Sequence, residues 1–165
     1  MTSSFAGSGI LFKGGNNMWS IINELLSVSK ELKIEVNILS AEITAEYFAK
    51  IEKKYLLDNY QSFLWDGLSD YSVLNDSSGW RYIGQFIGDK PCILFFYDLE
   101  KWKAAVINSG HELVSLIGEM YGFEFYVFDS SINYLICFNH HDQLMGVGSA
   151  KEWVNNLQEG STPHA

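Results

Sequence analysis

Two adjacent histidines followed by an aspartate are the first residues of this chain that could do chemistry. They lie in the stretch LICFNHHD, where His140, His141 and Asp142 follow Cys137 by three to five residues. These residue types bind transition metals or exchange protons. If the preceding segment is a strand, however, successive side chains alternate between its faces, and the two rings should point apart.

A metal site at this stretch also lacks partners. A structural zinc needs four ligands, and a site of two histidines and one carboxylate needs side chains that converge on one point. The chain offers two further histidines, His111 and His164. Cys137 and His140 could share an ion only if Cys92 or His111 came close in the fold. We therefore predict that the NHHD stretch forms a turn between two strands, with no metal and no cofactor.

Ser109, His111 and Glu112, in the stretch SGHEL, form a second cluster of candidate catalytic residues. Their position at the start of a helical pattern favours capping, because a serine accepts from free helix N–H groups and a glutamate stabilises the positive end of the helix dipole. The chain has no Gly-x-Ser-x-Gly elbow, no glycine-rich phosphate loop and no His-Glu-x-x-His motif. The sequence therefore indicates a protein that is not an enzyme.

An acidic and aromatic stretch is the best candidate for a binding surface. Between Tyr55 and Trp80 the chain has no lysine or arginine, and the segment from Asp58 to Gly79 has no clean helical or strand period. Tyrosine and tryptophan anchor protein interfaces, and interleaved carboxylates complement basic partners. The alternative is that the rings line the core of an irregular loop. The predicted partner-binding residues are Asp58, Tyr60, Trp65, Asp66, Asp70, Tyr71 and Asp76.

The overall charge favours a basic protein partner. The formal net charge is −9, and after Lys103 the only basic residue is Lys151. Such a surface repels phosphate backbones, so we expect no nucleic acid and no membrane as partner. The alternative is that the acidity only keeps an aromatic-rich protein soluble.

Cys92 and Cys137 lie in apolar runs and are expected to be buried thiols. Residues 1–9 lack the features of a signal peptide, so we expect a cytoplasmic protein.

The pattern of apolar residues predicts a single α+β domain with a mostly antiparallel sheet and about four helices packed on it. Helices are expected over 17–32, 41–57, 110–122 and 149–157, and strands over 33–40, 80–87, 91–98, 103–107, 123–129, 133–139 and 143–148. Residues 1–15 are expected to be a loose arm and residues 158–165 a polar tail. The hairpin of 123–129 with 133–139 should bury Phe125, Val127, Leu135 and Cys137.

The run FEFYVFDSSINYLICFNHHDQLMGVG, residues 123–148, resembles a block found in small bacterial proteins in which an aromatic hairpin leads into an Asn-His-His-Asp turn. Proteins of this size and acidity resemble immunity proteins of polymorphic-toxin and contact-dependent growth inhibition systems. The resemblance covers about sixty residues, 92–154. It implies a cytoplasmic protein that neutralises one cognate toxin, commonly a nuclease that forms the C-terminal domain of a large secreted or surface protein.

Three hypotheses follow from the sequence. The first is an immunity protein that blocks a basic toxin by direct contact and has no catalysis of its own. The second is a module that binds a small molecule or peptide on the aromatic face of the sheet. The third is a metal-dependent enzyme built on His140, His141 and Asp142.

Overall fold

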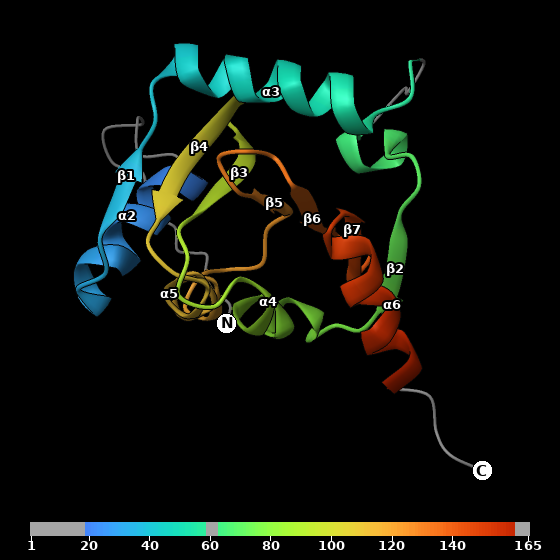
Figure 1. Ribbon diagram of the computed structural model, residues 1–165. Helices are drawn as coiled ribbons and strands as arrows, with labels where there is room; N and C mark the ends of the chain where they lie inside the picture. Colours follow the sequence, from blue (N-terminus) through green and yellow to red (C-terminus); the bar gives the residue numbers. More distant parts are fainter. Residues whose placement is uncertain (1–18, 59–62, 161–165) are drawn as a thin grey trace.

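Seven strands and five α-helices make up the residues that the structure describes, 19–58 and 63–160 of the computed structural model (Figure 1). The helices are α2 (Ile21–Leu32), α3 (Ala41–Tyr55), α4 (Ile83–Ile87), α5 (Gly110–Gly118) and α6 (Ala150–Gly160), with two short 3₁₀ helices, η1 (Leu64–Gly67) and η2 (Gly79–Tyr82). The strands are β1 (Val36–Ile38), β2 (Ser72–Asn75), β3 (Cys92–Asp98), β4 (Lys101–Ile107), β5 (Phe125–Phe128), β6 (Tyr134–Phe138) and β7 (Gln143–Gly148).

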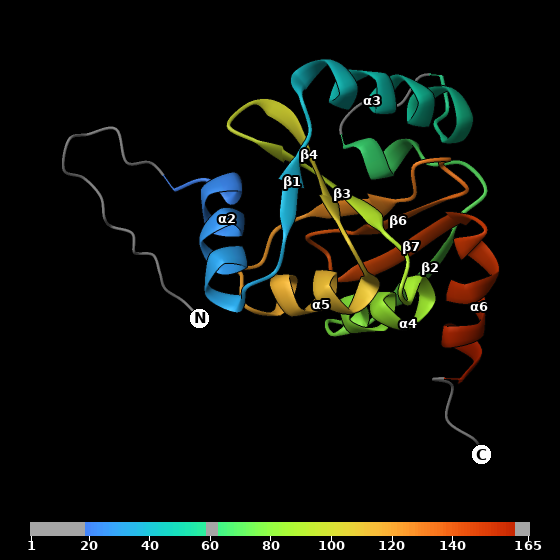
Figure 2. The ribbon, with the colours of Figure 1, turned by 60° about the vertical axis from the view of Figure 1, so that its left-hand side comes forward.

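All seven strands belong to one antiparallel sheet with the order β1-β4-β3-β5-β6-β7-β2. Figure 2 shows α3 on one side of this sheet and α4 and α5 on the other. The prediction of a single α+β domain with a mostly antiparallel sheet is confirmed. The described residues contain five α-helices where about four were expected, because α4 replaces a predicted strand.

The central strands are buried on both faces, which explains why they read as continuous apolar runs. Along β3, Leu94 and Phe96 belong to one core cluster, whereas Ile93 and Phe95 belong to the other. The first cluster packs against α2, α4, α5 and α6, and the second packs against α3 and η1. We call these two sides of the sheet the four-helix face and the α3 face.

The predicted hairpin is confirmed in pairing and burial. β5 pairs antiparallel with β6, with Val127 opposite Ile136. The four residues expected to be buried have exposed fractions of 1% or less: Phe125, Val127, Leu135 and Cys137. Phe125 and Val127 face the four helices, whereas Leu135 and Cys137 lie on the α3 face. The hairpin therefore contributes to both cores.

The prediction of a strand over 80–87 is wrong. These residues form most of η2 and all of α4, with Ile83, Gly84 and Ile87 buried at helical spacing. The reason is a close contact between two helices: a Cβ at Gly110 of α5 would lie 2.9 Å from the Gly84 carbonyl oxygen and 2.8 Å from the Ile87 Cβ. Two glycines let α4 pack on α5, so tertiary contact overrides the alternating pattern.

Several boundaries also differ from the predictions. Helix α5 ends at Gly118, before the predicted stop at Gly122, and α6 continues to Gly160, into the segment predicted to be a polar tail. Part of the acidic and aromatic stretch, expected to be irregular, forms the edge strand β2. Helix α2 begins at Ile21 with Ser20 as its N-cap. The predicted arm of residues 1–15 lies outside the described residues.

Candidate functional site

The NHHD stretch forms the turn between β6 and β7, as predicted. The Asp142 N–H donates to the Asn139 carbonyl at 3.0 Å, and Asp142 has a φ of 59°. Asn139 is buried, and its side-chain oxygen accepts from the N–H groups of His141 (2.9 Å) and Gln143 (3.2 Å). This pattern is typical of a three-residue hairpin loop closed by a residue in the left-handed region.

The prediction that the two histidine rings point apart is wrong. Their centroids are 4.1 Å apart with an interplanar angle of 45°. The alternation of side chains applies to an extended strand, and β6 ends at Phe138. His140 and His141 occupy the turn itself, where the backbone reverses direction and consecutive side chains can lie on the same side.

The turn lies against the acidic and aromatic stretch, about seventy-five residues away in the sequence. The Trp65 ring stacks on Phe63 at 5.5 Å and meets His140 and His141 edge-on at 5.9 and 5.7 Å. The backbone N–H of Trp65 donates to the hydroxyl of Tyr126 on β5 at 3.1 Å. The fold therefore brings together the two segments that the sequence analysis singled out separately.

The predicted partner-binding residues lie in different surroundings. Trp65, Asp66 and Tyr71 come together in a hollow of about 220 Å³ beside β2 and β7. Asp58 is exposed after α3, and Tyr60 lies outside the described residues. Asp70 pairs with Lys151 of α6, and the Asp76 carboxylate accepts from the Ser78 N–H at 2.9 Å. Asp70 and Asp76 thus have local structural partners, and the structure does not gather the set into one patch.

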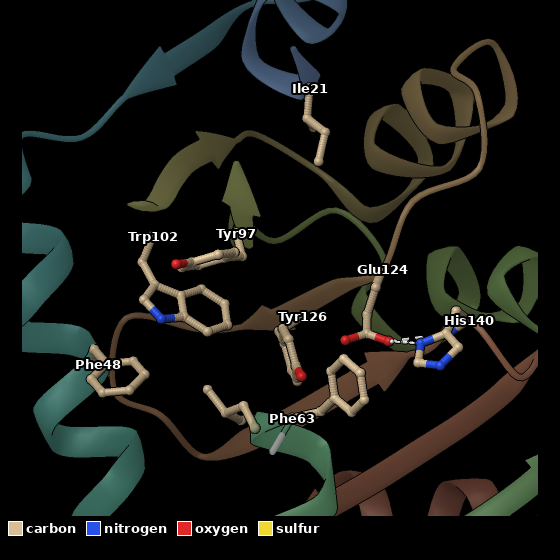
Figure 3. Close-up of a pocket in the computed structure, with 9 residues that line it drawn as sticks. Ile21, Phe48, Phe63, Tyr97, Trp102, Glu124, Tyr126 and His140 are labelled. Atoms are coloured by element: carbon tan, nitrogen blue, oxygen red, sulfur yellow. Dashed lines mark hydrogen bonds and ion pairs between the residues drawn. The ribbon is translucent and has the colours of Figure 1, made fainter. Parts of the chain in front are cut away.

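A larger cleft of about 580 Å³ opens on the α3 face, near the ends of β3 and β6. Figure 3 shows its side chains, which come from α2, α3, the segment of η1, the sheet and the loops at Glu124 and His140. The lining residues are Ile21, Phe48, Phe63, Leu64, Tyr97, Trp102, Glu124, Tyr126 and His140. Five of the nine are aromatic, one is acidic and none is a lysine or arginine.

Trp102 is the centre of the aromatic part of the cleft. It lies opposite Tyr97 across the β3–β4 hairpin, and the two ring centroids are 5.3 Å apart. Its other ring neighbours are Phe95, stacked at 4.6 Å, Phe48 of α3 at 5.5 Å, and Tyr126 at 5.9 Å. Each contact lies within the range of favourable aromatic pairs, so the rings hold one another in place.

Glu124 and His140 form the polar side of the cleft. Glu124 directly precedes β5, and its side chain lines the cleft together with that of Tyr126. One carboxylate oxygen, Oε1, accepts from the backbone N–H of His140 at 3.1 Å and lies 2.9 Å from its ring Nδ1. The Glu124 side chain is 22% exposed and the His140 side chain 48% exposed. This carboxylate is therefore only partly solvated.

Helix α2 is held beside the cleft by a buried carboxylate at the end of β3. Asp98 is 4% exposed, and its two oxygens accept from the backbone N–H groups of Ile21 at 3.1 Å and Ile22 at 3.0 Å. These N–H groups have no partner within the helix, and a carboxylate stabilises the positive end of the helix dipole. Asp98 thus positions Ile21 at the cleft.

A second hollow of about 370 Å³ adjoins the cleft at Glu124 and His140, which line both. Its rings are those of Trp80, Tyr121, Phe123, Phe125 and Phe138, and Asp142 adds a second carboxylate. Among the described residues, the lining of this hollow also contains no lysine or arginine. The two hollows therefore meet only at Glu124 and His140, beside the NHHD turn.

The nucleophilic groups near the cleft are held in their neutral forms. Burial raises the pKa of the Tyr126 hydroxyl and of the Cys137 thiol well above their ordinary values. A histidine paired with a carboxylate can act as a general base, but the lining residues within 19–58 and 63–160 include no serine, threonine or cysteine for it to activate. The arrangement favours binding through rings and a carboxylate.

Most residues of the cleft were not among the predicted binding residues. Phe48, Tyr97, Trp102 and Tyr126 lie in regular elements, where a strand or helix pattern assigns aromatic residues to the core. Glu124 precedes β5 as a single acidic residue in an apolar run. One signal was available: Tyr97 and Trp102 flank the turn residues Leu99 and Glu100. Large rings at the end of a hairpin extend beyond the sheet core, and Tyr97 is 53% exposed.

The described part of the chain has no group of three or more His, Cys, Asp or Glu side chains placed to hold one metal ion. Within 19–58 and 63–160, no helix has both the length and the apolar character needed to cross a bilayer.

Comparison with known proteins found no family model, curated protein or solved structure that matches the chain. The resemblance to immunity proteins therefore stays a hypothesis.

Proposed function

We propose that this protein is an immunity protein that binds a basic bacterial toxin and neutralises it by direct contact. The observation that carries the proposal is the cleft of about 580 Å³, which is lined by five aromatic side chains and one partly buried carboxylate. Tryptophan and tyrosine are enriched among the few residues that dominate the binding energy of protein interfaces, and carboxylates steer basic partners to them.

Exposed apolar side chains around this cleft support a protein partner. Phe63 and Tyr97, which line it, are 47% and 53% exposed, and Leu99 at the tip of the β3–β4 hairpin is 56% exposed. Trp19, two residues before Ile21, is 48% exposed. Apolar side chains concentrated at one place mark interaction sites, whereas scattered ones need no explanation. The proposed interface therefore combines this cleft with the hollow of Trp65, Asp66 and Tyr71.

The charge of the chain supports a basic toxin, such as a nuclease. The active site of a nuclease holds phosphates and is therefore positively charged, so a protein of net charge −9 is attracted to it. The proposal includes a cytoplasmic location, where a toxin that enters a cell meets its target. Cys92 and Cys137 are both free and buried, which suits a reducing compartment.

The proposal predicts that a neighbouring gene encodes the toxin, and the test is coexpression with the C-terminal domain of that gene product. We expect this protein to restore growth of cells that express the toxin and to form a stable complex on size-exclusion chromatography. Phe63→Ala and Trp102→Ala should weaken protection, whereas Leu32→Ala, a change of a 36% exposed side chain at the end of α2, should not. Circular dichroism checks that each variant is folded. Continued growth arrest despite expression of folded protein would contradict the proposal.

A pocket for a small molecule or free peptide is the second candidate. The cleft volume of about 580 Å³ falls within the range of small-molecule sites, roughly 300–1,000 Å³. A thermal-shift screen of metabolites separates the two candidates. The small-molecule candidate would be favoured if a compound raised the melting temperature of the parent but not of Trp102→Ala, and if the parent gave no protection against the toxin.

A further inference from the structure

We infer that the aromatic cleft binds the guanidinium group of an arginine side chain supplied by the partner protein. The inference rests on the proposed function for the identity of the partner, and on the geometry of Glu124, Trp102 and their neighbours for the chemistry. Arginine is among the residue types that contribute most to interface energies.

The carboxylate of Glu124 has one oxygen available for a cation. Both contacts from His140 go to Oε1, at 3.1 and 2.9 Å. Among the described residues, Oε2 has no hydrogen-bond partner, and Figure 3 shows it pointing away from His140 toward Tyr126. A carboxylate that is 22% exposed is partly desolvated, so a charge-assisted hydrogen bond to it is stronger than one formed in open water.

The aromatic rings of the cleft suit a planar cation. Figure 3 shows Tyr126 and Phe63 nearest to the carboxylate, with Tyr97, Trp102 and Phe48 farther along the same cleft. A cation near the faces of such rings is attracted by their electron density, most strongly by tryptophan. A guanidinium group also stacks on aromatic rings and is more weakly hydrated than an ammonium group. The cleft therefore favours arginine over lysine.

Other occupants fit the cleft less well. An anion would meet Glu124 without a lysine or arginine among the described lining residues to offset the repulsion. A purely apolar group would displace water from the Glu124 carboxylate and leave Oε2 unpaired, which is costly. A metal ion would find one carboxylate and one histidine in an otherwise mostly aromatic lining, fewer ligands than a stable site uses.

The experiment is an NMR titration of the whole chain labelled with ¹⁵N, which detects weak binding. The probes are Nα-acetyl-arginine methylamide, its lysine counterpart, and its citrulline counterpart, which has nearly the shape of arginine but no charge. We expect the indole N–H signal of Trp102 to shift with arginine. The affinity for citrulline should be about tenfold lower, and that for lysine should lie between the two.

Two variants locate the binding. Glu124→Gln keeps the shape of the side chain and removes its charge, and should weaken arginine binding by about five- to tenfold. Asp142→Asn is the matched control, because Asp142 is exposed, lines the second hollow and not the cleft, and asparagine tolerates its positive φ. This variant should bind arginine as the parent does.

Equal affinity for arginine and citrulline, tighter binding of lysine, or equal binding by Glu124→Gln and the parent would each overturn the inference. The comparison of the three probes uses the wild-type protein, so its result is valid even if a substitution unfolds the protein. Arginine binding in the cleft without protection against the toxin would leave this inference standing and contradict the proposed function. Unchanged toxin protection by folded Glu124→Gln would contradict this inference and leave the proposed function standing.

Discussion

One face of the sheet packs against four helices, whereas the other packs against α3 and the short helix η1. The four-helix face is filled mainly by aliphatic side chains such as Leu94, Leu113 and Ile136. The α3 face carries much of the ring cluster of Phe95, Tyr126, Phe128 and Trp102. Because one helix does not cover the whole face, the cleft remains beside α3.

This difference indicates that one face of the sheet mainly stabilises the fold, whereas the other also offers a surface for binding. The four-helix face contributes mainly to the free energy of folding, and the second hollow, of about 370 Å³, opens at its edge. A face covered in part retains rings that are half-buried, held by their neighbours and still accessible, as interface anchors are. The four predictions below test this division, from the largest expected effect to the smallest.

The first prediction is that both faces contribute equally to the deep core. Leu94 on the four-helix face and Leu135 on the α3 face are each 1% exposed or less. Leu94→Ala and Leu135→Ala should each lower the free energy of unfolding by about 2–5 kcal/mol, since each leaves a cavity. Urea denaturation measures both. A loss below about 1 kcal/mol for Leu135→Ala alone would mean that the α3 face is loosely packed beyond the cleft.

A second prediction concerns the tightness of the four-helix face at α6. A Cβ at Gly146 of β7 would lie 2.7 Å from the Ala150 carbonyl oxygen and 2.8 Å from Val154 Cγ2. Gly146→Ala should therefore cost about 1–3 kcal/mol of stability through overpacking.

The matched control for this change is Gly122→Ala. A Cβ at Gly122, which lines the second hollow, would meet nothing within 4 Å. Its melting temperature should stay close to that of the parent. If both alanine variants melt alike, close packing of β7 against α6 is not what requires glycine at position 146.

The third prediction is a loss of stability at alkaline pH. Burial raises the pKa of the Cys92 thiol on the four-helix face from 9.0 to about 12. Because the folded-state pKa is the higher one, the stabilisation is complete below pH 9 and is lost as the pH rises from 9 toward 12. At pH 10 this thiol alone should cost about 1.4 kcal/mol relative to pH 8.

Urea denaturation at pH 8 and pH 10 measures this loss. Cys92→Ala serves as the control, because it removes the contribution of this thiol and leaves that of Cys137. The variant should lose less stability between the two pH values than the parent. An identical loss of stability in both proteins would show that folding does not raise the pKa of Cys92.

The smallest expected effect is on the rate of association with the toxin. Asp58 is exposed and precedes η1 beside the cleft face. Asp58→Lys should slow association roughly two- to fivefold at low salt, and less at high salt, because exposed charges mainly steer encounter. Glu31→Lys, an equal charge reversal near the end of α2, is the control. Stopped-flow kinetics at two salt concentrations measure the association rates of both variants. Equal slowing by both would mean that the net charge, and not the position of Asp58, controls association.

The sequence by itself determined the features that depend on neighbouring residues. The hairpin of β5 and β6, the NHHD turn and the Ser109 cap of α5 were all predicted correctly, and the Ser109 hydroxyl accepts from the Glu112 N–H at 3.1 Å. Strand period, turn chemistry and capping each act within a few residues, so the local sequence is sufficient to specify them.

The tertiary structure decided whatever depends on distant residues. Residues 80–87 became helical through the contact of Gly84 with Gly110, and β2 became a strand by pairing with β7. The cleft itself combines side chains from position 21 to position 140, each of which looks like an ordinary core or surface residue in its own segment. The physical reason is that a sequence pattern shows which residues should be buried, whereas the packing of α3 and η1 decides which of them stay accessible.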